Sequence, residues 1–172
     1  MTRATRRLFF ALWPSDAIRA ALTETCRPAL DACAGRVVPA RHYYITLAFL
    51  GDQPAHQVER LAAMAVVVPP EFELVLDHFG HWRRSRVLWI GPHGCPAGLT
   101  TLVTQIRLAL DELDVSYDGH DFKAHLTLAR KVRTSPELEG PIPVHWPVRS
   151  FVLVESVATP DGPIYRVVRE FA

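Results

Sequence analysis

The sequence predicts an α+β fold in which two related lobes share one core. Strand-like runs alternate with helical stretches along the chain. A five-residue motif in the first half returns in the second half, and no linker separates independent domains. With 172 residues, 49% of them hydrophobic, the chain can bury a core of ordinary size, so residues 1–172 are expected to form a single domain.

The first lobe is predicted to begin with a strand and a helix. Residues 8–13 are apolar and indicate a buried strand. Pro14-Ser15-Asp16 then offers an N-cap and an acidic first turn for a helix. Pro28 lacks an amide N–H and clashes with the preceding turn, so it is expected to kink or break this helix.

A second strand and a second helix follow. Residues 43–50 indicate a strand, and Pro54 starts a helix with one apolar face that Pro69-Pro70 ends. The apolar face of this helix is predicted to consist of Val58, Leu61, Ala62 and Ala65.

The second lobe is predicted to open with a hairpin and a helix. Residues 72–82 and 86–90 indicate strands joined by the polar turn 83–85. A third helix follows, and a loop over residues 114–121 leads to the strand with the second motif. The apolar stripe of the third helix is Leu99, Leu102, Val103, Ile106, Leu110 and Leu113.

The end of the chain is predicted to hold a loop and a hairpin. Residues 134–147 carry four prolines and are expected to form a loop or lid. Residues 148–157 and 165–171 are expected to pair around the turn 160–163.

The repeated motif predicts two half-sites. It reads Tyr44-Ile45-Thr46-Leu47-Ala48 in the first half and His125-Leu126-Thr127-Leu128-Ala129 in the second. Side chains alternate faces along a strand, so the first and third residues of each copy share a face. The other face of the first copy should be core, and it comprises Tyr43, Ile45, Leu47 and Phe49.

These motifs resemble those of the 2H phosphoesterase superfamily, and in particular those of its RNA 2′,3′-cyclic phosphodiesterase branch, also called bacterial 2′-5′ RNA ligases. Residues 7–14, 46–51 and 125–130 are similar to that branch's opening strand and its two His-x-Thr motifs. Ser156, Gly162 and Tyr165 resemble its closing hairpin. The resemblance implies two pseudo-symmetric lobes, each an antiparallel sheet flanked by helices, with a central cleft.

The resemblance also implies a reaction and its residues. The reaction is hydrolysis of 2′,3′-cyclic phosphate ends to a 2′-phosphate, with reversible 2′-5′ RNA ligation as its reverse. One histidine acts as acid and the other as base, and His125 matches the base. Thr46, Thr127 and Arg130 match the phosphate-binding positions. The acid position holds Tyr44, which is a poor base at pH 7 but can still donate a proton.

Alternatives remain open at several of these positions. Tyr44 could be an aromatic residue that fills a half-site without turnover, and His42 could replace it. Strict alternation places Arg130 on the face opposite His125, so it reaches the phosphate only if a bulge or the end of the strand turns it. The alternative function is a non-catalytic module that binds RNA-end or nucleotide phosphates.

Composition limits the partners. A net charge of +1 gives no broad basic field for duplex nucleic acid, and the expected partners are RNA ends or small nucleotides with a 2′,3′-cyclic phosphate. No metal-ligand spacing is present, and neither a metal nor another cofactor is expected. Three cysteines argue against a disulfide framework. Residues 8–13 are too short to be a signal peptide or a membrane span, so a cytoplasmic location is expected. The protein is also expected to be a monomer.

Overall fold

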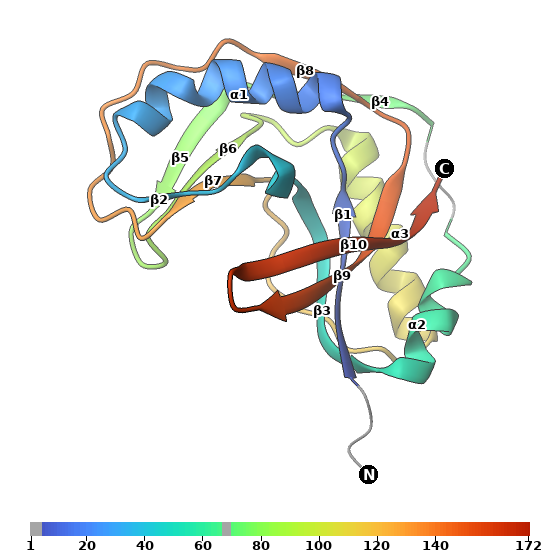
Figure 1. Ribbon diagram of the computed structural model, residues 1–172. Helices are drawn as coiled ribbons and strands as arrows, with labels where there is room; N and C mark the ends of the chain where they lie inside the picture. Colours follow the sequence, from blue (N-terminus) through green and yellow to red (C-terminus); the bar gives the residue numbers. More distant parts are fainter. Residues whose placement is uncertain (1–4, 67–69) are drawn as a thin grey trace.

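The computed structural model describes residues 5–66 and 70–172, and its architecture is α+β with antiparallel sheets, as the sequence predicts (Figure 1). One sheet has eight strands, in the order β10-β9-β1-β3-β7-β6-β5 with β2 paired to β7, and a second sheet pairs β4 with β8. The elements are β1 (Thr5–Leu12), α1 (Asp16–Asp31), β2 (Arg36–Val37), the 3₁₀ helix η1 (Ala40–His42), β3 (Ile45–Pro54), α2 (Ala55–Ala62), β4 (Phe72–Leu76), β5 (His78–Trp82), β6 (Val87–Gly91), α3 (Ala97–Glu112), β7 (Leu126–Arg130), β8 (Val144–Val148), β9 (Phe151–Thr159) and β10 (Gly162–Phe171).

The large sheet consists of two halves that meet at one point. β10, β9, β1 and β3 form one half, and β7, β6 and β5 form the other. β3 and β7, both fully described, pair through Ile45 and Leu126 alone. A helix links two neighbouring strands in each half: α1 links β1 to β3, and α3 links β6 to β7. The two lobes are therefore a repeated strand–helix–strand unit fused into one sheet.

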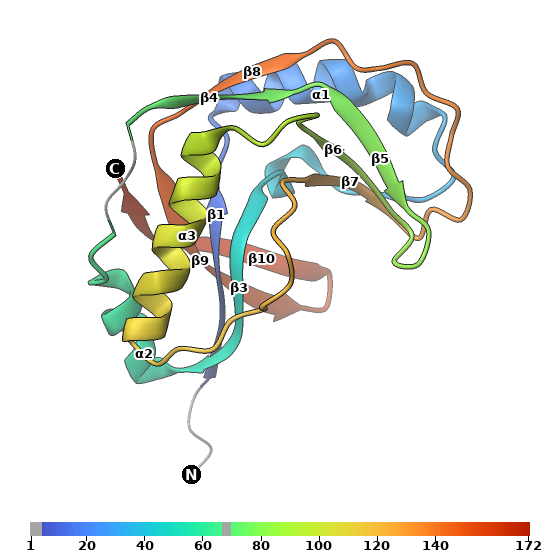
Figure 2. The same cartoon turned by 180° about the vertical axis from the view of Figure 1, so that it is seen from behind.

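The helices connect the two halves through the core. α1 contacts β7 and β8, whereas α3 contacts β3 and β4 (Figure 2). Each long helix therefore packs against one strand of the half that it does not itself link and one strand of the two-stranded sheet. The shared apolar core stabilises both halves together. The predicted stripe of α3 is confirmed, because Leu99, Leu102, Val103, Ile106 and Leu110 are buried and Leu113 is half-buried.

The predicted break of the first helix at Pro28 and part of the predicted apolar face of the second helix were wrong. Pro28 does not end the first helix, because α1 continues to Asp31 and the Ala32 N–H donates to the Pro28 carbonyl at 3.1 Å. The proline removes one helical N–H, and burial of its neighbours Cys26 and Ala29 stabilises the helix around it. α2 ends at Ala62, so Ala65 lies beyond it and is exposed.

The rest of the predicted apolar face of α2 agrees with the sequence, whereas its predicted end does not. Val58 and Leu61 are buried, and Ala62 is half-buried. The predicted stop at Pro69-Pro70 was wrong, because α2 already ends at Ala62; Pro69 itself lies outside the described residues.

Two predictions about strands also need correction. Residues 72–82 form two strands in different sheets, and the chain changes sheets at Asp77, whose N–H donates to the Gly91 carbonyl. Within residues 134–147, the last part forms β8, an edge strand of the two-stranded sheet. Pro147 is exposed there, and an edge strand tolerates a residue without an N–H.

Candidate active site

Both motif copies line one cleft of about 490 Å³. Tyr44 lies directly before β3 and Thr46 within it, and His125 lies directly before β7 and Thr127 within it. The pairing of Ile45 with Leu126 brings the two strand ends together. The intervening residues Ile45, Leu47, Leu126 and Leu128 are buried, as the alternation of faces predicts. A volume of this size is typical of small-ligand sites.

A β-bulge follows the threonine in each copy of the motif. In β3 the pairing with β1 passes from Thr46 to Ala48 and skips Leu47. In β7 the pairing with β6 passes from Thr127 to Ala129 and skips Leu128. An extra residue in one strand reverses the alternation beyond it.

The bulges decide where two predicted residues lie. Arg130 lines the cleft with His125, which the sequence allowed only if a bulge turned the strand. Phe49 is the corresponding residue of the first copy, and its predicted core position was wrong. It packs against a separate cluster with Phe9 and Tyr44 instead of the main core.

The first half-site is an aromatic cluster around Tyr44. The Tyr44 ring stacks on Trp13 with centroids 5.8 Å apart, and it lies 4.9 Å from Phe9 and 5.1 Å from Tyr165. Burial and, next, the interaction with the Tyr165 side chain raise the pKa of the Tyr44 phenol above its ordinary value of 10.0. Nearby Arg130 lowers this pKa in part. Tyr44 is therefore neutral at physiological pH and can donate a hydrogen bond or, weakly, a proton.

The second half-site presents an imidazole with a defined tautomer. His125 Nδ1 lies 2.8 Å from the Lys123 carbonyl oxygen, and because that oxygen can only accept, Nδ1 carries the proton. Nε2 is then left with a lone pair that can accept a proton. Burial lowers the pKa of His125 below 6.5; the Lys123 carbonyl raises it, and the charges of Arg130 and Lys123 lower it further. The Trp82 ring packs edge-on against the imidazole, with centroids 4.4 Å apart.

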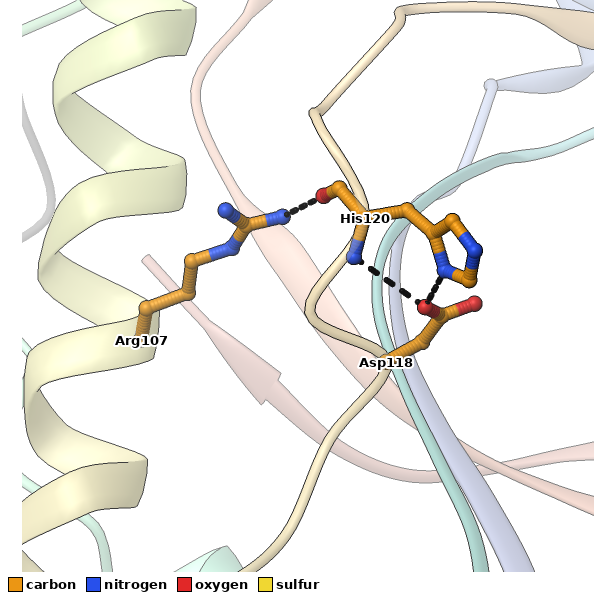
Figure 3. Close-up of polar contacts among 3 residues, drawn as sticks. All are labelled: Arg107, Asp118 and His120. Carbon is orange, nitrogen blue, oxygen red and sulfur yellow. Dashed lines mark hydrogen bonds and ion pairs between the residues drawn. The ribbon is translucent and has the colours of Figure 1, made fainter.

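A loop ahead of β7 is held to α3 and β3 (Figure 3). Arg107 of α3 donates to the His120 carbonyl at 2.8 Å, and the Asp118 carboxylate pairs with the His120 ring and accepts its backbone N–H. The Asp118 N–H donates to the Phe49 carbonyl at 2.9 Å. These contacts hold the loop that leads to His125 against α3 and against β3.

Several residues in the cleft wall were missed by sequence reasoning. Trp82 and Ser85 come from the β5–β6 hairpin, and Asp161 comes from the tip of the β9–β10 hairpin. Arg36 and Arg41 also line the cleft. None of them belongs to a motif, and only their position in the fold brings them to the site.

His42 also lines the cleft, with its ring 4.9 Å from that of Tyr165. Burial and the charges of Arg41 and Arg19 lower its pKa below 6.5. His42 is therefore near the first half-site, but it lies in η1, two residues before Tyr44 and ahead of the strand that carries Thr46.

The described residues offer neither a metal site nor a membrane-spanning helix. They contain no group of three or more His, Cys, Asp or Glu side chains that could hold a metal ion. None of their helices is long and apolar enough to cross a membrane. A second hollow, of about 670 Å³, is lined by Arg7 and Glu155, shares Tyr165 with the motif cleft, and contains neither motif. The chemistry of the side chains favours the motif cleft as the site.

Comparisons with known proteins identify the family. The model of the 2′-5′ RNA ligase superfamily matches residues 11–159, which hold both motifs. The chain belongs to this superfamily. It is 33% identical over 137 residues to the RNA 2′,3′-cyclic phosphodiesterase of Escherichia coli strain K12, covering 79% of this chain and 78% of that protein. It is 32% identical to the protein of that name from Archaeoglobus fulgidus, covering 96% and 99% of the two chains.

Solved structures of superfamily members have the same fold. The crystal structure of Escherichia coli LigT complexed with 3′-AMP matches with a TM-score of 0.88 and 30% identity, over 98% of both chains. The crystal structure of a phosphoesterase matches with a TM-score of 0.89 and 30% identity, also over 98% of both chains.

Proposed function

We propose that this superfamily member is a metal-independent RNA 2′,3′-cyclic phosphodiesterase that leaves a 2′-phosphate. The observation that carries the proposal is the convergence of both motifs in one cleft, which Tyr44, Thr46, His125 and Thr127 all line. The named relatives support the same reaction, because they are called RNA 2′,3′-cyclic phosphodiesterases.

The reaction needs a base, an acid and donors to the phosphoryl oxygens. His125 Nε2 takes a proton from water as the water oxygen bonds to phosphorus. The bond from phosphorus to the ribose O3′ breaks, and O3′ takes a proton from the opposite side, where Tyr44 lies. Thr46, Thr127 and Arg130 donate to the phosphoryl oxygens as negative charge moves onto them. The same sequence with a ribose 5′-hydroxyl in place of water is 2′-5′ ligation: the hydroxyl oxygen bonds to phosphorus, gives its proton to the base, and the bond to O3′ breaks.

Tyr44 weakens the acid side of this mechanism. Its raised pKa leaves it protonated, as an acid must be, but makes transfer of the proton less favourable than from a histidine. A single chain carries both half-sites, so a monomer has the complete site.

A specific observation supports the alternative of a phosphate-binding module without turnover. Tyr44 is packed among Phe9, Trp13 and Tyr165, as a residue that fills space would be. In that case the threonines and Arg130 hold a cyclic phosphate, and no bond is broken.

A kinetic assay decides between these functions. Nucleoside 2′,3′-cyclic phosphates are incubated with the protein, and the position of the product phosphate is determined by chromatography against 2′- and 3′-nucleotide standards. We expect the 2′-phosphate and loss of the activity in His125→Ala. Tight binding of the cyclic nucleotide with no turnover establishes the binding module instead.

A further inference from the structure

The rim of the cleft carries a concentration of positive charge that the net charge of +1 does not reveal. It lies where the β5–β6 turn, the end of β7 and β2 come side by side, in both Figure 1 and Figure 2. We name this surface the basic edge. It consists of Arg36, Arg83, Arg84, Arg130, Lys131 and Arg133, all of which are exposed.

The backbone under the basic edge is fixed by hydrogen bonds and packing. The Val132 N–H donates to the Arg86 carbonyl at 3.0 Å, and His81 Nε2 bonds to the Val132 carbonyl at 2.9 Å. Val132 is fully buried. A Cβ on Gly35, the residue before β2, would lie 2.6 Å from the Val132 side chain, so the start of β2 also packs closely against Val132.

Two residues of this framework adopt a left-handed conformation. Lys131 and Arg86 have φ of 59° and 56°, values that are uncommon for residues other than glycine. Such residues persist only where the surrounding structure holds them. The hydrogen bond from the Val132 N–H to the Arg86 carbonyl joins the segments that contain Lys131 and Arg86, so the backbone that carries these cations is held in place.

The basic edge is continuous with the catalytic cleft. Arg36 and Arg130 are paired across β2 and β7, and both line the cleft. Among the described residues, none of the six cations of the basic edge takes part in an ion pair. Their charge is therefore available to a ligand that leaves the cleft on this side.

We propose that the basic edge holds the backbone phosphates of single-stranded RNA on the 5′ side of the cyclic end. The proposal rests on the proposed function for the occupant of the cleft. A cyclic phosphate can stand only at the end of a chain, so the rest of the strand must leave the cleft along a wall. The exposed arginines supply sequence-independent phosphate contacts there. The preferred substrate is then an oligoribonucleotide and not a mononucleotide.

The test removes charge outside the cleft and avoids the two left-handed residues. The variant Arg83→Gln/Arg84→Gln/Arg133→Gln is compared with Arg27→Gln/Arg60→Gln/Arg149→Gln, which removes the same charge from exposed positions elsewhere. A third variant, Arg83→Lys/Arg84→Lys/Arg133→Lys, keeps the charge. Affinity for a fluorescein-labelled oligoribonucleotide ending in a 2′,3′-cyclic phosphate is measured by anisotropy at several salt concentrations. Affinity for a nucleoside 2′,3′-cyclic phosphate is measured by calorimetry.

We expect the glutamine variant of the basic edge to bind the oligoribonucleotide about tenfold more weakly at low salt. The salt slope, meaning the slope of the logarithm of affinity against the logarithm of salt concentration, should fall in magnitude by about 2, because each lost phosphate contact removes about 0.7. Mononucleotide affinity, the control variant and the lysine variant should remain near the parent. An unchanged salt slope in the glutamine variant, or an equal loss in the control variant, would overturn the proposal. Binding needs no turnover, so a protein that binds the strand but does not hydrolyse it contradicts only the proposed function.

Discussion

The two half-sites share a backbone and differ in their side chains. Each has a threonine two residues after the first motif residue, and each has a bulge directly after that threonine. The first motif residue is a phenol in one half and an imidazole in the other. The residue turned by the bulge is Phe49 in the first half and Arg130 in the second.

The comparison shows that the two copies of the motif share a backbone geometry, whereas the chemical groups on that backbone differ between them. In the first half, three motif positions face away from the main core. Two of them, Tyr44 and Phe49, hold aromatic rings, and the third is Thr46. In the second half, the same positions hold a titratable base and a guanidinium. We infer that the second half-site carries the proton transfer and the phosphate charge, whereas the first frames the substrate and supplies a weak donor.

The largest effect is expected for His125→Ala. Loss of a general base lowers turnover by roughly 10²–10⁴-fold. His125 is only half-buried and lies on the cleft, so thermal unfolding should stay cooperative. The measurements are kcat/KM on a nucleoside 2′,3′-cyclic phosphate and a calorimetric melt. Activity within a few-fold of the parent would remove His125 from the mechanism.

Tyr44→His tests the other half-site. A histidine there titrates near neutrality, so turnover should rise by up to roughly 10²-fold if the first half-site holds the leaving oxygen. The comparison variant is Tyr44→Phe, which keeps the ring and removes the hydroxyl. If Phe matches Tyr and His gains nothing, the first half-site has no catalytic role. If Phe is much slower than Tyr, the phenol is a working donor.

Much of this arrangement could be predicted from the sequence. The alternation of Ile45 and Leu47 with Tyr44 and Thr46 is a local pattern, and it identified the two faces at the start of β3 correctly. The resemblance of both motifs to one family supplied the expectation that they meet. Neither inference needed long-range packing.

The rest depended on contacts that sequence periodicity does not encode. A bulge is a mismatch between two strands, so the orientation of Phe49 and Arg130 depends on β1 and β6 as much as on the motifs. Pro28 remains helical because tertiary packing outweighs its intrinsic cost. Arg36, Ser85 and Asp161 reach the cleft from three separate segments, and no local pattern marks them.

Gly80→Ala tests how closely the second half-site is packed. A Cβ on Gly80 would lie 2.0 Å from the Trp89 ring, which is buried beside Trp82. We expect a loss of about 1–3 kcal/mol in the free energy of unfolding from overpacking, with a drop in kcat because the indoles support His125. Gly94→Ala is the matched control, since a Cβ there meets nothing within 4 Å. Equal stability of the two variants in urea titrations would contradict the expectation.

The pH dependence of kcat/KM should reflect the unequal pKa shifts of the two half-sites. The base works when it is unprotonated, and the pKa of His125 is lowered, so the acid limb should lie below pH 6.5. The pKa of Tyr44 is raised above 10.0, so no basic limb should arise from it near neutrality. Tyr44→His should add a basic limb close to the histidine pKa. A parent profile with a basic limb at neutral pH would mean that another group, such as His42, is the acid.

The smallest effect is expected from Asp118→Asn, in the loop that leads to His125. Its partner His120 has a raised pKa, so the pair stabilises the folded state fully below pH 6.5, and this is lost as pH rises through the raised value. The pKa of Asp118 is lowered, so its contribution is present above pH 3.8 and lost as pH falls through the lowered value. Asparagine keeps an acceptor for the His120 N–H but loses the charge. The melting temperatures of parent and variant should therefore differ most between about pH 4 and 6.5, by a small amount because both groups are exposed, and should converge at high salt. A difference that does not change with pH would show that Asp118 acts only as a backbone acceptor.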